Sequence, residues 1–374
     1  MTTPQILISA GEASGDMYAA RLATALRSRT GVHLFGLGGP RMREAGVELV
    51  ADSAEVAVIG ISEFVRRVPA GWRVLRRLAA ESAKRRPRLA VLVDSPELQL
   101  RLARRLFRQG VRNIYFICPQ LWAWRPWRVR LVKRFFERAL CIFPFEEAYY
   151  RKAGVAVDFI GHPLVDQVRA QMSPTEFAAR YGLEAKRPIV ALLPGSRPGE
   201  IAHNLPRMVE ACRLIGREHA AQFVLAVASG LRTAQLAAYA RRDVPVHMVE
   251  SATYDALAAA QIAIISSGTA TVEAALLGTP MVVVYRVSRT SAFLARRLVR
   301  APFFSMTNLI AGRRVVPELI QDDFTPKQVA EEAHRLLDEP MARDQMKRDL
   351  AEVRSRLGPG GAIERAAEII AQML

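Results

Sequence analysis

Residues 262–273 have the sequence Ile262-Ala263-Ile264-Ile265-Ser266-Ser267-Gly268-Thr269-Ala270-Thr271-Val272-Glu273. An apolar run of strand length is followed by small residues and then by helix-forming residues, which is typical of a buried strand that turns directly into a helix. Such a turn leaves backbone N–H groups free at a helix N-terminus, where partial positive charge favours a phosphate. Glu273, one turn into the helix, is placed to accept hydrogen bonds from a sugar joined to that phosphate.

A second turn of the same kind follows the apolar run Ile189–Leu192, with the sequence Leu193-Pro194-Gly195-Ser196-Arg197. Arg197 carries a planar fork of donors that matches two phosphate oxygens at once. Either turn alone also fits an ordinary strand–helix loop, and Arg197 alone fits a surface arginine. Two phosphate-binding turns in one half of the chain predict a site for a nucleotide diphosphate that includes Gly195, Ser196, Arg197, Ser267, Gly268 and Thr269.

Apolar runs of strand length alternate with helical patterns along the whole chain. We expect strands at 6–10, 33–37, 89–93, 114–117, 139–143 and 159–161, and then at 189–193, 223–228, 246–249, 262–266 and 281–285. This alternation predicts an α/β fold with two Rossmann-like domains whose parallel sheets face a shared cleft. We expect an N-terminal domain over 1–168 and a C-terminal domain over 169–374, with the last helix packing back on the N-terminal domain.

The positive charge of the chain is concentrated in one segment. The formal net charge is +17, and between Arg66 and Arg138 there are 20 Lys and Arg residues but only 4 Asp and Glu residues. Such a surface attracts nucleic acid, anionic lipid or a phosphorylated substrate, although arginines on solvated helices would give the same count. Residues 70–86 predict a helix that either lies on an anionic membrane or packs on the sheet through one face, formed by Trp72, Leu75, Leu78, Ala79 and Ser82.

Several classes of site are excluded by missing motifs. The chain has no Walker A sequence, no nucleophile elbow and no D-x-D pair, and its glycines lack the spacing of a dinucleotide-binding loop. Three widely spaced cysteines form neither a zinc cluster nor a disulfide framework, which favours a reducing, cytoplasmic compartment. No apolar run reaches the roughly 18 residues that a membrane-spanning helix requires. We therefore expect no cofactor and no metal.

Acid–base candidates follow the expected strands at their carboxyl ends, where parallel α/β sheets bind ligands. Asp94 ends a buried strand, and a carboxylate so placed can abstract a hydroxyl proton. The same residue could instead cap the helix that starts at Pro96. Glu12 and His162 are further candidates, although a histidine before a proline in a turn also fits a structural role.

A set of longer motifs occurs along the chain: Ala10-Gly11-Glu12-Ala13-Ser14-Gly15-Asp16, Gly38-Gly39-Pro40-Arg41-Met42, Trp122-Ala123-Trp124-Arg125, Phe143-Pro144-Phe145-Glu146, Gly161-His162-Pro163-Leu164, Leu193–Arg197, Ser267–Glu273, Pro280-Met281-Val282-Val283 and Pro317-Glu318-Leu319-Ile320-Gln321. In this order they resemble the lipid-A-disaccharide synthase family, over roughly residues 6–321. The resemblance implies a GT-B fold and an inverting, metal-independent glycosyltransferase. It also implies that UDP-2,3-diacylglucosamine is joined to 2,3-diacylglucosamine 1-phosphate, which gives a β-1,6 disaccharide and UDP in lipid A biosynthesis.

The resemblance further implies roles for single residues. Asp94 matches the general base, and Glu12 matches a functionally important glutamate of the cleft. Arg197, the turn 267–269 and Glu273 fall on the UDP side, and Asn308 matches an asparagine near the nucleotide. The chain departs from the family pattern at Glu97-Leu98-Gln99, Cys118-Pro119-Gln120-Leu121 and Ser305-Met306-Thr307. The first two departures border the acceptor side, where they bear on acyl-chain preference.

The expected partners are the two lipid substrates and an anionic membrane surface, without nucleic acid. We expect a cytoplasmic protein peripherally bound to the inner face of the bacterial inner membrane, and the oligomeric state stays open, a homodimer included. Another GT-B UDP-sugar transferase with a lipid-linked acceptor would share this layout. A nucleic-acid binder would need aromatic platforms interleaved with basic residues on strands, whereas the four tryptophans fall in expected helices or strand-end loops: Trp72, Trp122, Trp124 and Trp127.

Overall fold

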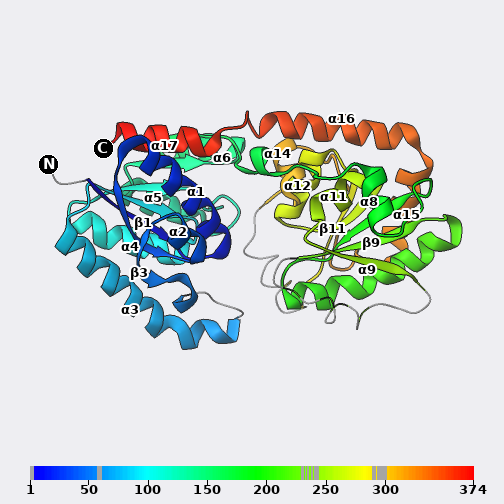
Figure 1. Ribbon diagram of the computed structural model, residues 1–374, viewed down its shortest axis with the longest axis horizontal. Helices are drawn as coiled ribbons and strands as arrows, with labels where there is room; N and C mark the ends of the chain where they lie inside the picture. The colour runs from blue at the N-terminus through cyan, green and yellow to red at the C-terminus, as the bar shows by residue number, and fades with distance from the viewer. Residues whose placement is uncertain are drawn as a thin grey trace. The chain divides into compact units, whose positions relative to one another are not determined.

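The computed structural model of the protein describes residues 4–56, 61–228, 244–288 and 301–374 and a few single positions between them, with the backbone alone over 61–68. These residues form two compact units, each built on a parallel sheet (Figure 1). The first unit contains the chain up to Pro163 together with Gly358–Leu374, and the second contains Leu164–Leu357. The predicted fold of two parallel-sheet α/β domains is confirmed.

The described residues of the first unit form a sheet of seven strands in the order β3-β2-β1-β4-β5-β6-β7. Its strands are β1 (Gln5–Ala10), β2 (His33–Gly38), β3 (Glu48–Asp52), β4 (Leu89–Val93), β5 (Arg112–Phe116), β6 (Arg138–Cys141) and β7 (Val157–Phe159). Its helices are α1 (Ala13–Thr30), α2 (Pro40–Glu44), η1 (Ser53–Glu55), α3 (Ile61–Arg85), α4 (Pro96–Arg108), η2 (Pro126–Arg128), α5 (Val129–Phe135), α6 (Pro144–Lys152) and α17 (Ala362–Gln372). The strand order reverses between β1 and β4, and a doubly wound sheet binds its ligand outside the carboxyl ends of the strands at such a switch point.

The described residues of the second unit form a sheet of six strands in the order β10-β9-β8-β11-β12-β13. Its strands are β8 (Ile189–Leu193), β9 (Gln222–Val227), β10 (Val246–Glu250), β11 (Ile262–Ser266), β12 (Met281–Tyr285) and β13 (Glu318–Ile320). Its helices are α7 (Leu164–Gln167), α8 (Pro174–Arg180), α9 (Pro198–Glu218), α11 (Thr253–Ala259), α12 (Thr269–Leu277), α14 (Met306–Ala311), α15 (Pro326–Asp338) and α16 (Pro340–Arg356). Here the order reverses between β8 and β11, so the two phosphate-binding turns predicted from the sequence follow the two strands of the switch point.

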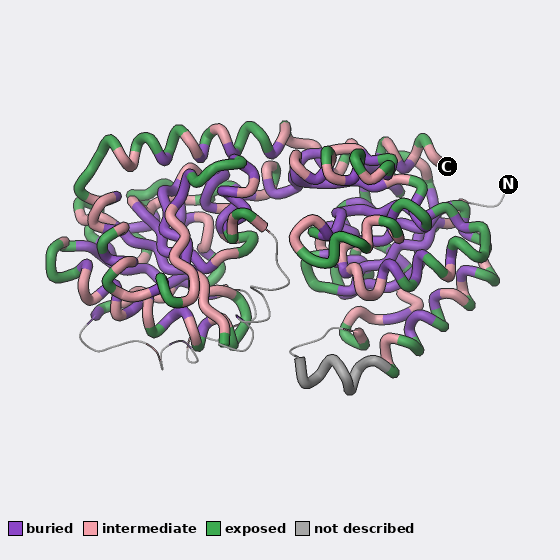
Figure 2. The backbone as a smooth tube through the Cα atoms, turned by 180° about the vertical axis from the view of Figure 1, so that it is seen from behind, coloured by how far each residue is buried: buried purple, intermediate pink, exposed green. Residues whose placement is uncertain are grey.

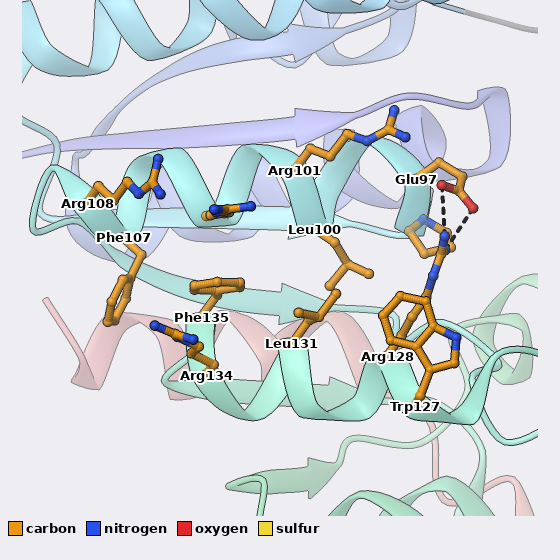
Figure 3. Close-up of a pocket in the computed structure, with 12 residues that line it drawn as sticks. Glu97, Leu100, Arg101, Phe107, Arg108, Trp127, Arg128, Leu131, Arg134 and Phe135 are labelled. Carbon is orange, nitrogen blue, oxygen red and sulfur yellow. Dashed lines mark hydrogen bonds and ion pairs between the residues drawn. The ribbon is translucent and has the colours of Figure 1, made fainter.

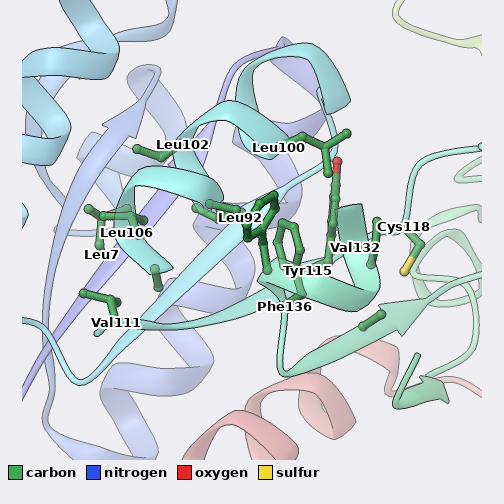
Figure 4. Packing of buried hydrophobic residues seen from close by; sticks show 14 of the residues in the cluster. Leu7, Leu92, Leu100, Leu102, Leu106, Val111, Tyr115, Cys118, Val132 and Phe136 are labelled. Atoms are coloured by element: carbon green, nitrogen blue, oxygen red, sulfur yellow. The ribbon is translucent and has the colours of Figure 1, made fainter. Parts of the chain in front are cut away.

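Both sheets are buried on their two faces, because helices cover each side. The central strands β4 and β11 are buried along their whole length, and Figure 2 shows buried strands inside each unit with exposed helix faces outside. In the core of the first unit Leu92 and Leu106 pack with Tyr115, whose ring stacks on Phe136 with the ring centres 4.6 Å apart (Figure 4). This core fixes the end of β4, which carries Asp94.

The last helix, α17, belongs to the first unit and lies alongside α1 (Figure 1). Its Ala366 and Ile370 are buried. Arg365 donates two hydrogen bonds to the carbonyl oxygen of Ile160, at 2.9 and 2.6 Å, and Glu364 pairs with Arg29 at 2.6 Å. The end of the chain therefore completes the unit that the start of the chain builds.

The apolar face predicted on α3 packs inside the protein, so the alternative of a membrane-facing stripe is wrong. Leu75, Leu78 and Ser82 are between 0 and 2% exposed. Trp72, at the start of this face, is the exception, because it is 45% exposed. The guanidinium of Arg105 lies over its ring, 4.9 Å from the ring centre. A crossover helix needs such a stripe to cover its sheet. Within the described ranges, no helix is long and apolar enough to cross a membrane.

Candidate active site

The switch point of the first sheet brings Glu12 and Asp94 to the carboxyl ends of β1 and β4. Asp94 and Ser95 have positive φ angles of 49° and 36°, a backbone conformation that costs non-glycine residues energy and that clusters at functional sites. The hydroxyl of Tyr115 donates to the Asp94 carbonyl oxygen at 2.9 Å, and the Asp94 N–H donates to Phe116 at 3.2 Å. The core thus holds Asp94 in a strained turn.

The electrostatics of this turn favour a base that works near neutral pH. Burial, and then the charge of Glu12, raise the pKa of Asp94 to about 6. Glu12 is exposed and accepts a hydrogen bond from the Ser95 hydroxyl at 3.3 Å. Ser95, not Asp94, is the N-cap residue of α4. Ser95 thus stands at the cap position that the sequence left open for Asp94, but its side chain makes no capping hydrogen bond.

A third carboxyl group, Glu146, was not foreseen as part of this site. It is fully buried at the start of α6 and accepts a hydrogen bond from the Trp122 indole N–H at 3.3 Å. Burial raises its pKa to about 8, and the charge of Asp94 acts in the same direction. A buried acid that is neutral at pH 7 adds no charge that would repel an ionised Asp94.

Two other residues near these strand ends, His162 and Gln99, are buried inside the protein. His162 is 2% exposed with its ring centre 5.0 Å from that of Phe143, and burial lowers its pKa to about 3, so the imidazole is neutral at physiological pH. Gln99, one of the departures from the family pattern, is fully buried. Its amide donates to the carbonyl oxygens of Ser9 at 2.9 Å and Val93 at 3.2 Å. That side chain ties β1 to β4 and does not reach solvent.

The second unit contains a cavity of about 740 Å³ at its own switch point. Its lining residues come from the ends of β8, β9, β10, β11 and β12, from the first turns of α9, α11 and α12, and from the segment before α8. Among them are seven predicted residues: Gly195, Ser196, Arg197, Ser267, Gly268, Thr269 and Glu273. The sequence did not point to other lining residues, namely Arg169, Gln171, Tyr254 and Tyr285.

The turn before α12 depends on its glycine. Gly268 has φ 155° and ψ −160°, a region that is essentially restricted to glycine. Thr269 and Ala270 begin α12, so their amides lie at a helix N-terminus, which carries partial positive charge. The prediction that the Ser267 amide is free to bind phosphate is wrong. Its N–H donates to the Val284 carbonyl oxygen at 3.0 Å, and its hydroxyl donates to the Phe304 carbonyl oxygen at 2.7 Å. The β11–β12 ladder continues one residue past the strand and uses this donor.

The turn after β8 places a cation at the other side of the cavity. Arg197 precedes the 21-residue helix α9, its side chain is 78% exposed, and its guanidinium lies 3.3 Å from Glu200. Gly195 has φ 118°, and a Cβ atom there would lie 2.6 Å from the Glu200 carboxylate. Because its side chain is largely exposed, Arg197 can turn toward a ligand in the cavity, and the glycine at 195 leaves room for the Glu200 carboxylate.

Glu273 lies on the cavity-lining side of α12, as its position in the sequence predicts. It is half-buried and accepts a hydrogen bond from the Tyr254 hydroxyl at 3.1 Å. Burial raises the pKa of this carboxyl group, and the Tyr254 bond opposes that shift. The second carboxylate oxygen can accept hydrogen bonds from vicinal hydroxyl groups of a ligand.

Asn204 connects the turn after β8 to the turn after β11, and the sequence analysis did not predict this role. This fully buried side chain of α9 donates to the Pro194 carbonyl oxygen at 3.0 Å and to the Ser266 hydroxyl at 3.1 Å, and it accepts from the Arg286 N–H at 3.1 Å. One amide group thereby fixes the ends of β8, β11 and β12. The cavity wall is preorganised by this residue.

Asn308 does not line the cavity, in contrast to its predicted contact with the nucleotide. Its fully buried amide donates to Val316 at 3.0 Å and Glu318 at 2.8 Å, and it accepts from the N–H groups of Val315 and Val316. Every hydrogen-bonding position of the amide is filled. Asn308 orders Glu318, which also accepts the backbone N–H of Ser305 at 2.8 Å.

One group of described residues has the chemistry of metal ligands. His219, His334 and Asp338 place their ligand atoms within 4.8 Å of one another. None of the three lines the cavity of the second unit. Asp94 and Glu12, in the other unit, are not part of the group, so this cluster has no place in the chemistry of the candidate site.

A family model described as lipid-A-disaccharide synthetase matches residues 6–372. The chain is 46% identical to the lipid-A-disaccharide synthase of Solibacter usitatus, with 99% of this chain and 98% of that protein covered. It is 44% identical to the lipid-A-disaccharide synthase of Myxococcus xanthus, with 99% and 98% covered. The chain belongs to the lipid-A-disaccharide synthase family. The resemblance of its motifs is thereby confirmed, and so is the prediction of an enzyme of lipid A biosynthesis.

Solved structures similar to this member of the lipid-A-disaccharide synthase family include an epimerase and a glycosyltransferase. The UDP-GlcNAc 2-epimerase from Neisseria meningitidis bound to UDP-GlcNAc has a TM-score of 0.67 at 11% identity, with 99% of this chain and 100% of that chain covered. The calicheamicin glycosyltransferase CalG4 has a TM-score of 0.63 at 16% identity, with 100% and 99% covered. At such identities the likeness shows the GT-B fold alone.

Proposed function

We propose that this protein is an inverting glycosyltransferase that joins UDP-2,3-diacylglucosamine to 2,3-diacylglucosamine 1-phosphate. The products are the β-1,6 disaccharide 1-phosphate and UDP. The family match over residues 6–372 carries the reaction class. The position of Asp94 at a switch point, with a pKa of about 6, supports the mechanism.

In this mechanism Asp94 takes the proton of the acceptor 6-hydroxyl while the hydroxyl oxygen attacks the anomeric carbon of the donor sugar. The bond between that carbon and the diphosphate oxygen breaks, its electron pair leaves with UDP, and the configuration inverts. Arg197 and the Gly268, Thr269 and Ala270 amides stabilise the charge on the leaving diphosphate, so no divalent metal is needed. Glu273 accepts hydrogen bonds from the ribose hydroxyls.

The acceptor belongs to the first unit and UDP to the second in this proposal. Both substrates carry acyl chains that partition into a bilayer, and the first unit carries the arginine-rich segment between Arg66 and Arg138. A basic surface gains affinity for an anionic leaflet. We therefore place the reaction at the cytoplasmic face of the bacterial inner membrane.

The experiment incubates the purified protein with both lipids and follows UDP release together with the mass of the lipid product. UDP and the disaccharide 1-phosphate should form in equal amounts, and neither should form when one lipid is left out. UDP release without a disaccharide contradicts the proposal. Faster transfer from a different UDP-sugar would favour the alternative, another UDP-sugar transferase with a lipid-linked acceptor.

A further inference from the structure

An open groove of about 510 Å³ lies between α4 and α5 of the first unit (Figure 3). Its floor is apolar, because the buried Leu100 and Phe135 and the half-buried Leu131 line it. An aromatic ring stands at each end: Phe107 is 51% exposed and Trp127 is 59% exposed. Small-molecule sites have volumes of roughly 300–1,000 Å³, so the groove is large enough to hold part of a ligand.

Besides Arg128, four arginines line this groove: Arg101, Arg104 and Arg108 on α4, and Arg134 on α5. Within the described part of the chain, none of the four forms an ion pair with a carboxylate. The carboxylate at the groove, Glu97, is already held by Arg125 at 3.0 Å and by Arg128 at 2.7 Å. Uncompensated positive charge above an apolar floor is complementary to a ligand with an anionic group and an apolar chain.

The groove starts next to the candidate general base. Glu97 lines one end, and it lies three residues after Asp94 at the carboxyl end of β4. In Figure 3 a strand arrowhead points toward the end where Glu97 and Trp127 are labelled, and α4 leads from there to Phe107. The 13 residues of α4 extend about 20 Å at 1.5 Å per residue, which is enough to follow a fatty acyl chain.

We propose that this groove binds a fatty acyl chain of the acceptor, with the sugar phosphate on the rim arginines. The inference rests on the proposed function. In that acceptor the reacting hydroxyl is at carbon 6, whereas the phosphate and the acyl groups are attached at carbons 1, 2 and 3 across the sugar ring. When the hydroxyl faces Asp94, the phosphate and the chain extend away from it, in the direction that α4 takes. Arginine pairs with phosphate through two hydrogen bonds, and the chain removes the apolar floor from water.

A first experiment measures binding without turnover. Dodecyl phosphate below its micellar concentration is titrated calorimetrically, with inorganic phosphate and dodecyl maltoside as reference probes. The parent should bind dodecyl phosphate more tightly than either reference. The double variant Arg101→Gln/Arg104→Gln and the single variant Leu131→Gln should each weaken that binding about tenfold. Arg130→Gln is the matched control, since Arg130 is an exposed arginine of α5 outside the groove. Equal binding by the parent and both groove variants overturns the proposal.

A second experiment compares acceptors of graded acyl length. The groove variants should raise the acceptor KM about tenfold, remove the gain in affinity that longer chains give the parent, and leave UDP binding unchanged. Thermal unfolding checks that each variant is folded. An unchanged KM together with weaker binding to phosphatidylglycerol vesicles assigns the groove to the bilayer and overturns the proposal. A parent that forms no disaccharide refutes the proposed function, whereas an active parent whose groove variants keep its KM refutes this inference alone.

Discussion

Replacing Asp94 by asparagine tests the proton transfer, because the amide keeps the shape of the side chain but is not a base. General-base catalysis contributes roughly 10²–10⁴-fold, so turnover should fall at least about 10²-fold. In the parent, burial and the charge of Glu12 raise the pKa of Asp94 to about 6. The value of kcat/KM should therefore fall about tenfold for each pH unit below 6 and level off above about pH 7. Asp94→Asn should lose this dependence.

The raised pKa also sets the direction of the effect on stability. The unfolded chain releases the Asp94 proton near pH 3.9, whereas the folded protein holds it to about pH 6. The folded state thus binds more protons between these values, and the stability that Asp94 contributes falls as pH rises through this window. Two pKa units correspond to about 3 kcal/mol, an upper limit for a half-buried group. Asp94→Asn removes the free-energy cost of ionising this carboxyl group in the folded protein. The variant should therefore be more stable than the parent at pH 8 but not at pH 4.

The assays are UDP release between pH 5 and 9 and thermal unfolding followed by circular dichroism at pH 4 and 8. Glu44→Gln is the control, because it removes an exposed carboxylate of α2 in the same unit. Near-parent turnover by folded Asp94→Asn would refute the assignment and make Glu12 the candidate base. Lower stability than the parent at pH 8 would refute the reasoning about the pKa.

Four further predictions concern the donor cavity. Arg197→Ala should lower kcat/KM about 10²-fold or more, as removal of one preorganised donor does. The control Arg217→Ala, at the far end of α9, should leave kcat/KM unchanged, and equal losses in the two variants would exclude a specific role for Arg197. Glu273→Gln should weaken UDP binding about tenfold by calorimetry with an unchanged melting temperature, and parent-like affinity would remove it from the ribose site. Gly268→Ala forces a φ angle of 155° on a residue with a Cβ atom. The free energy of unfolding, measured by urea titration, should therefore drop by about 1–3 kcal/mol, and an unchanged value would mean that the turn adapts. Excess EDTA should leave turnover unchanged, because amides and a guanidinium stabilise the leaving group, and a loss restored by Mg²⁺ would contradict this.

The strands could be predicted where burial on both faces leaves a continuous apolar run, as in β4 and β12. The edge strands β3 and β13 were missed, since each is short and contains acidic residues. The expected strand at 159–161 is offset from β7, because Asp158, which pairs with Arg138, interrupts the apolar pattern. The α3 stripe was ambiguous, because a helix that covers a sheet and one that lies on a membrane share the same pattern.

The turns of the site could be predicted because motif and topology agree there. Residues such as Arg197 and Gly268 stand directly after strands, so their place at a switch point follows from the order of the elements. The hydrogen bonds of Ser267 could not be predicted, since its partners lie on β12 and before α14. The burial of Asn204 and Glu146 could not be predicted, because no local pattern shows that Asn204 bonds the Pro194 carbonyl or that Glu146 bonds the Trp122 indole.

The anomeric configuration of the product tests the central claim most directly. A single displacement with Asp94 as the base inverts the donor carbon, so an α-linked UDP-sugar should give a purely β-linked disaccharide. The disaccharide made by the purified protein is examined by proton NMR, where the coupling between the first two ring protons of the transferred sugar distinguishes the anomers. A β linkage to carbon 6 of the acceptor is the predicted result. An α linkage, or a mixture of both, would contradict an inverting transferase built on this site.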